Sequence, residues 1–161
     1  MRARFVSLLL PGVLVAAGLS AETKTSGTAT CKPDPATPVA IPDQPNHSFA
    51  AGRAQCTWTK FEVAGLQYKD GISTDLEEIT GDTVSARGYH VATLTNGDTT
   101  VAKFQGSAKL KDGKPVSGEG TWSFTGGTGK LKGIKGKGTY KGTANADGSV
   151  TYQVDCEYSL P

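Results

Sequence analysis

The 161-residue chain lacks any long stretch in which apolar residues recur with a helical period. Apolar and polar residues instead alternate in short segments that are separated by glycine, asparagine and aspartate. This pattern is typical of β-strands joined by tight turns. We therefore expect an all-β fold with little helix.

Residues that mark common catalytic or cofactor sites are also scarce. The chain has only two histidines, His47 and His90, and no group of His, Cys and acidic residues has the spacing of a zinc site. The glycines before Lys130 do not form a phosphate loop, because Phe124 and Leu131 occupy positions that need glycine and Ser or Thr. No nucleophile elbow is present. We expect neither a metal nor a cofactor.

The chain has little excess charge of either sign. It carries 17 basic and 15 acidic residues, and without Arg2 and Arg4 the two counts are equal at 15 each. We therefore expect no nucleic-acid partner. The lysine-rich stretch 107–146 is interpreted as a solvated face of the sheet, since edge lysines protect sheets against aggregation.

The first 20 residues have the features of an export signal. Arg2 and Arg4 precede an apolar stretch that is too short and interrupted to span a membrane, and small residues follow up to Ser20. We predict a signal peptide at 1–20, a disordered tether rich in Pro and Thr at 21–50, and a β-barrel domain at 51–161. No later segment could span a membrane, so the expected location is periplasmic or extracellular.

Three cysteines in an exported chain leave one without a partner. Cys56 begins the first strongly predicted strand, Cys156 lies in the last one, and Cys31 lies in the predicted tether. Because the first and last strands of a barrel are often neighbours, we predict a Cys56–Cys156 disulfide and a free Cys31. Such a bridge would contribute up to ~4–5 kcal/mol in the chain-entropy model.

The remaining sequence predicts seven or eight strands with short connections. Strands are expected at 56–63, 73–79, 83–95, 99–110, 118–125, 137–144 and 149–159, with one helical turn at 131–134. Asn96-Gly97-Asp98 is the strongest hairpin signal. In the loop Gly126–Gly129 we expect at least one glycine with positive φ. The expected architecture is a single antiparallel barrel of about eight strands.

One segment of this barrel resembles a known family. From Gly120 to Tyr140 a strand ends in Gly-Gly-Thr-Gly and a Gly-x-Gly-Thr-Tyr strand follows. This resembles the allene oxide cyclase-like superfamily of calycin-like barrels, which includes dirigent proteins. The resemblance implies the barrel fold and a possible homo-oligomer, a trimer in several plant members. Avidin-like and lipocalin-like barrels are competing resemblances, although Cys56-Thr57 before Trp58 lacks the Gly-x-Trp of lipocalins.

Large rings in the predicted strands are the candidate ligand-binding residues. They are Trp58, Tyr89, Phe104, Trp122, Phe124 and Tyr140. Their simplest role is to fill the core, but an eight-stranded barrel can also hold a small apolar ligand. The acidic residues Asp75, Glu77 and Glu78 are interpreted as a solvated edge rather than a catalytic pair.

Two functions remain open from the sequence. The first is an exported barrel that binds a small apolar molecule or a partner. The alternative, implied by the resemblance alone, is an isomerase or cyclase that acts on a lipid-derived substrate in the barrel. A buried polar residue deep in a cavity would favour the enzyme.

Overall fold

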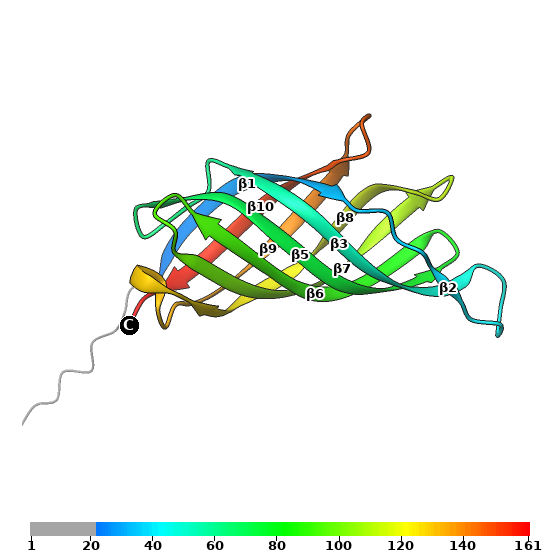
Figure 1. The fold of residues 1–161 in the computed structure, drawn as a ribbon, viewed down its shortest axis with the longest axis horizontal. Helices are drawn as coiled ribbons and strands as arrows, with labels where there is room; N and C mark the ends of the chain where they lie inside the picture. Colours follow the sequence, from blue (N-terminus) through cyan, green and yellow to red (C-terminus); the bar gives the residue numbers. More distant parts are fainter. Residues whose placement is uncertain (1–21) are drawn as a thin grey trace, which may run out of the picture.

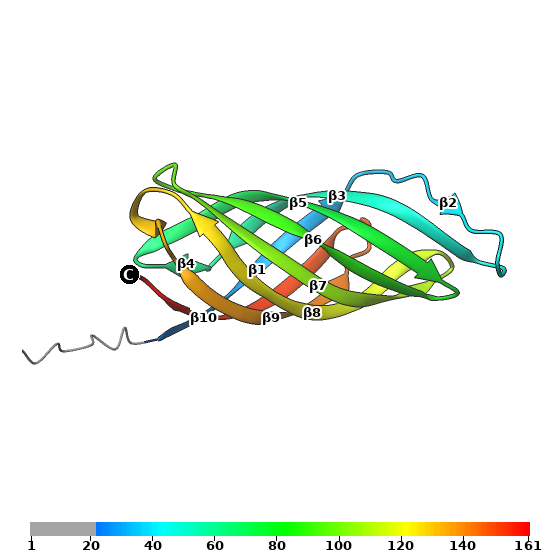
Figure 2. The same cartoon turned by 90° about the horizontal axis from the view of Figure 1, so that it is seen from below.

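The computed structural model describes residues 22–161, which form a closed antiparallel barrel (Figures 1 and 2). The predicted signal at 1–20 lies outside the described residues. The eight strands of the barrel are β1 (Thr23–Pro33), β3 (His47–Thr59), β5 (Leu66–Thr80), β6 (Thr83–Leu94), β7 (Thr99–Lys111), β8 (Lys114–Gly127), β9 (Lys135–Ala144) and β10 (Val150–Ser159). Two further strands, β2 (Val39–Ala40) and β4 (Glu62–Val63), and the 3-10 helix η1 (Gly129–Leu131) are short.

Strands β5 to β10 follow one another as a meander, and β1 and β3 close the ring. β1 pairs with β10 from Thr23 to Cys31 and with β3 from Thr28 to Pro33, and β3 pairs with β5. The strands predicted from residue 83 onward correspond to β6–β10, and the hairpin at Asn96-Gly97-Asp98 is confirmed. The expected all-β barrel of about eight strands is therefore confirmed.

The prediction of a disordered tether at 21–50 is wrong for its first part, which forms β1, and for residues 47–50, which begin β3. Residues 23–33 form β1, and the chain then crosses through β2 to the start of β3 at His47. Thr23, Thr25, Thr28 and Thr30 are β-branched and fit a pleated strand, but the prolines that follow dominated the composition of the window. The first strand predicted at 56–63 is also displaced, because β3 ends at Thr59.

The disulfide prediction is wrong as well. Cys31 on β1 lies directly opposite Cys56 on β3, and the two form the disulfide. Cys156 is free and buried, and burial raises the pKa of its thiol to about 12. The first and last strands are neighbours, as the prediction assumed, but the disulfide does not join them. The first strand, however, is β1, which the tether prediction had removed from the barrel.

The apolar core lies at one end of the barrel, beside η1 and the C-terminus (Figure 1). Its large, deeply buried side chains are Phe61, Val63, Leu94, Leu131 and Ile134. Burial of each such side chain contributes about 1.5–3 kcal/mol. Phe61 and Val63 come from the loop between β3 and β5, which folds inward and closes this end. We call it the closed end.

Candidate ligand cavity

The other half of the barrel is hollow. A cavity of about 820 Å³ extends from the core towards the opposite end, which we call the mouth. The mouth is bordered by residues 33–36 after β1, by the β7–β8 hairpin at 113–115 and by the β9–β10 hairpin at 144–148. The expectation that the rings simply fill the interior therefore holds only for the closed end.

Rings that lie flat on glycines of neighbouring strands keep this interior open. Tyr140 on β9 extends across Gly120 on β8 to Gly106 on β7, and a methyl group at either glycine would overlap its hydroxyl. Tyr152 lies in the same way on Gly142, where an added Cβ would be 2.5 Å from the ring. The glycines thus allow the rings to line the wall instead of projecting into the cavity.

Five of the six predicted ring residues line the cavity. Trp58, Phe104, Trp122, Phe124 and Tyr140 all do so. Tyr89 does not, because it points outward from β6 and is 55% exposed. Sequence reasoning missed Phe61, Tyr68 and Tyr152, which also line the wall. Tyr152 could have been found from the alternation of β10, where Val150, Tyr152 and Val154 share one face.

A hydrogen-bonded group of Trp58, His90 and Ser73 lies in the cavity wall. The Trp58 Nε1–H donates to His90 Nε2 at 3.1 Å, and Ser73 Oγ is 2.9 Å from His90 Nδ1. Because an indole N–H only donates, His90 must be neutral with its proton on Nδ1, which donates to Ser73. Burial lowers the pKa of His90 to about 4, in agreement with this arrangement. The His90 ring therefore offers Ser73 no base, and the pair is not a nucleophilic dyad.

Two carboxyl groups also face the cavity. Asp75 and Glu77 alternate on the inner face of β5, while Glu78 faces outward. The interpretation of these residues as a solvated edge is wrong, because β5 is a central strand paired on both sides with β3 and β6. Burial raises the pKa of Asp75, and burial followed by the charge of Asp75 raises the pKa of Glu77.

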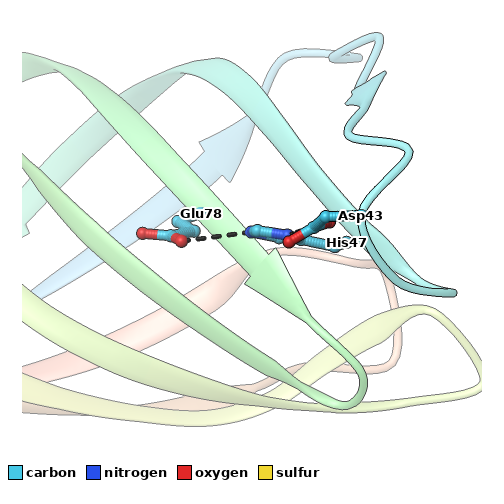
Figure 3. Close-up of polar contacts among 3 residues, drawn as sticks. All are labelled: Asp43, His47 and Glu78. Atoms are coloured by element: carbon cyan, nitrogen blue, oxygen red, sulfur yellow. Dashed lines mark hydrogen bonds and ion pairs between the residues drawn. The ribbon is translucent and has the colours of Figure 1, made fainter.

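Ion pairs hold the segment 34–47, the first part of which borders the mouth. Asp34 pairs with Arg53 at 2.5 Å, and the Asp34 N–H donates to the Arg53 carbonyl. Figure 3 shows His47 between Asp43 and Glu78, at 2.8 Å and 3.1 Å from its two ring nitrogens. Because both partners are carboxylates, both nitrogens donate when His47 is protonated. Hydrogen bonds to Asp43 and then Glu78 raise the pKa of His47.

The outer face of the barrel is polar over β7–β10. Lys103, Lys137 and Lys141 are exposed on it, with acidic residues such as Asp155 close by. The lysines are thus spread over a solvated face rather than placed along an edge. Among residues 22–161, no group of three His, Cys, Asp or Glu side chains could hold a metal, and no helix is long and apolar enough to cross a membrane.

Comparison with solved structures finds similar barrels. The pterocarpan synthase dirigent protein GePTS1 has a TM-score of 0.49 and 16% identity, over 96% of this chain and 98% of that one. The pterocarpan synthase dirigent protein PsPTS1 has a TM-score of 0.48 and 17% identity, over 86% and 95%. A DUF3224-family protein of unknown function from Shewanella oneidensis MR-1 has a TM-score of 0.49 and 15% identity, over 88% and 99%.

Two of these three similar structures are dirigent proteins. No protein-family model matches the chain, and no characterised protein matches its sequence significantly.

Proposed function

We propose that this protein holds a small, largely apolar molecule inside its barrel without transforming it. The observation that carries the proposal is the cavity of about 820 Å³, which has aromatic walls and lies in the half of the barrel next to the mouth. A concave, mostly apolar site with a few polar groups is the usual form of a small-molecule site. The Cys31–Cys56 disulfide supports an exported location for this function, since such bonds persist in oxidising compartments.

Intrinsic fluorescence offers a direct measurement of occupancy. Trp58 and Trp122 are the only tryptophans of the chain, and both line the cavity. A panel of fatty acids, terpenoids and phenolics is titrated while emission and melting temperature are followed. A bound ligand is expected to change the emission and raise the melting temperature.

A matched pair of variants separates cavity binding from surface binding. Ala86 faces the cavity from β6, whereas its neighbour Ser85 is exposed on the outer face. Ala86→Leu should weaken binding about tenfold or more by occupying the cavity, and Ser85→Leu should leave it unchanged. If no compound in the panel changed the emission or melting temperature of the wild type, binding of a protein partner would replace this proposal.

The second candidate is an isomerase or cyclase that acts on a lipid-derived substrate in the cavity. Asp75 and Glu77 favour it, because a carboxyl group with a raised pKa can donate a proton inside a pocket. The test is incubation with a lipid epoxide, followed by chiral analysis of the products. Turnover that Asp75→Asn or Glu77→Gln abolishes without loss of binding would favour the enzyme over the binding protein.

A further inference from the structure

We propose that the molecule held in the barrel carries a positively charged group, and that Asp75 and Glu77 bind this group. This inference rests on the proposed function and adds the chemical class of the ligand. That class is an amine, guanidine or quaternary ammonium compound with an apolar body.

The two carboxylates have no partner within the described part of the protein. Among residues 22–161, neither Asp75 nor Glu77 forms a hydrogen bond or an ion pair, although the pocket partly buries both. A charge withdrawn from water without a partner costs free energy. A cationic ligand would supply the missing partner for both groups.

The residues paired with these carboxylates on both sides are small. On β3 and β6, Asp75 lies between Gly52 and Gly88, and Glu77 lies between Ala50 and Ala86. Ala86 in turn pairs with Gly106 on β7, so the residue beyond it is also small. With neighbours this small, no long side chain of the flanking strands covers the carboxylates, and a ligand group can approach them from the cavity.

The cavity lining carries more acidic than basic side chains. Four carboxylates line it, against two cationic side chains, with His90 neutral; the six are Asp34, Asp75, Glu77, Asp147, Arg53 and Lys114. Arg53 is already paired with Asp34, and Lys114 lies in the β7–β8 hairpin at the mouth. The lining is therefore net negative, although residues 21–161 carry equal numbers of basic and acidic residues. Such a cavity attracts cations and repels anions.

The cavity wall also contains aromatic rings. Tyr140 and Tyr152 contact each other edge to face, with ring centroids 5.7 Å apart. Burial, followed by the charges of Asp75 and Glu77, raises the pKa of Tyr152, and burial, followed by Tyr152 and Asp75, raises the pKa of Tyr140. Tyr152 therefore lies within electrostatic reach of both carboxylates, and Tyr140 within reach of Asp75. Aromatic faces attract cations, and the rings also accommodate an apolar body.

The test compares three compounds that share one body and differ in charge: phenylbutylammonium, phenylbutanol and phenylbutyrate. Binding to the full folded chain is measured by tryptophan emission and by calorimetry. The ammonium compound should bind about tenfold or more tightly than the alcohol, and the carboxylate should bind most weakly. In the Asp75→Asn/Glu77→Gln double variant the preference should fall below about threefold, with binding of the alcohol unchanged.

Glu119→Gln is the matched control, because Glu119 is exposed on the outer face of β8, and it should retain the full preference. The preference can be expressed as the logarithm of the affinity ratio between the ammonium compound and the alcohol. If the double variant folds poorly, each single variant should still lose about half of this value. Equal binding of the ammonium compound and the alcohol to the wild type would overturn this inference and leave the proposed function intact. The inference also fails if the preference persists in the double variant. Failure of all three compounds to bind the wild type would contradict both proposals.

Discussion

At the scale of single residues, the interior is organised by pairs of one ring and one glycine. Tyr152 and Gly142 are directly opposite on β10 and β9, and the three atoms nearest to an added Cβ at Gly142 belong to the Tyr152 and Val150 side chains. No backbone atom is that close. The effect of filling this position should therefore depend on the ring of Tyr152.

We expect Gly142→Ala to destabilise the barrel by about 1–3 kcal/mol, because the new methyl group displaces the ring. In the background of Tyr152→Leu the same change should cost less, which gives a coupling free energy in a double-mutant cycle measured by urea unfolding. Gly126→Ala is the control, since an added Cβ there meets nothing within 4 Å. Additive effects of Gly142→Ala and Tyr152→Leu would show that the ring is not the cause.

The two histidines should titrate far apart. NMR titration should give His90 a pKa of about 4, because burial and the donated Trp58 N–H favour the neutral ring. His47 should titrate above its ordinary value of 6.5, because Asp43 and Glu78 stabilise the imidazolium. A similar pKa for both histidines would contradict the assigned hydrogen bonds.

These shifts have opposite effects on stability. The folded-state pKa of His90 lies below the unfolded value. The stability that neutral His90 contributes is therefore present above pH 6.5, and up to about 3 kcal/mol of it is lost as the pH falls towards 4. The folded-state pKa of His47 is raised, so its contribution is present below pH 6.5 and is lost as pH rises through that pKa. His90→Gln should weaken the dependence on acid between pH 6.5 and 4, as measured by urea unfolding.

At the scale of secondary-structure elements, the disulfide joins β1 to β3 close to the point where the two strands separate. Cys31 is two residues before the end of β1, and the sequence separation from Cys56 is 25 residues. A loop of this length corresponds to about 3–4 kcal/mol in the chain-entropy model. The bond therefore holds β1 against β3 near the mouth.

Replacement of Cys31 or Cys56 by Ser should thus lower stability by up to about 3–4 kcal/mol. Cys156→Ala should have a smaller effect, because this thiol is free and only its packing is lost. Thermal unfolding of the three variants provides the measurement. Peptide mapping without reductant should recover Cys31 linked to Cys56, and recovery of Cys156 in a disulfide would refute the assignment.

The loop between β8 and β9 contains the glycine with positive φ that the sequence predicts. Gly129 has φ of +53°, so the predicted positive φ is present. Gly127 is constrained by contact instead, because an added Cβ would lie 2.5 Å from the Leu131 carbonyl oxygen, a backbone atom. Gly127→Val should cost about 1–3 kcal/mol in urea unfolding. Wild-type stability combined with lost ligand binding would instead identify the loop as a ligand contact.

The sequence predicts the later elements well and the earlier ones poorly, for physical reasons. Between residues 83 and 159, alternation and glycine turns occur together, so β6–β10 can be located. β1 consists mainly of Thr, Ser, Ala and Gly, which carry little apolar signal, and its partners lie far along the chain. Asp75 and Glu77 were misplaced because acidic residues are rare on an inner face, although Ser73, Asp75, Glu77 and Ile79 share one face by simple alternation.

At the scale of the whole molecule, the two inner carboxylates are expected to lower the stability of the ligand-free barrel, although they serve the proposed binding of a cation. Asp75 and Glu77 have raised folded-state pKa values, so the folded state is favoured when they are protonated. The loss of stability that their ionisation causes is absent below their unfolded pKa values of about 4. It grows as the pH rises from there through the folded values. Homo-oligomerisation, which the family resemblance implies, stays a prediction.

Asp75→Asn and Glu77→Gln should therefore stabilise the ligand-free barrel at pH 7, each by less than about 1 kcal/mol because both groups are half exposed. The gain should disappear near pH 3. Unfolding in urea at the two pH values checks this, with Glu119→Gln as the control on the outer face. Destabilisation at pH 7 would mean that the carboxylates have partners in the free protein.

The pairing of β1 also determines the order in which the barrel can form. Residues 23–27 pair only with β10, so these residues have no strand partner until the last strand is available. The Cys31–Cys56 contact, by contrast, is local and can form while the chain is still incomplete. Because distant pairings are slow to form, closure between β1 and β10 should be the final and slowest step of folding. An early disulfide would keep β1 beside β3 until β10 has formed, so that the two ends of the sheet meet in the correct register.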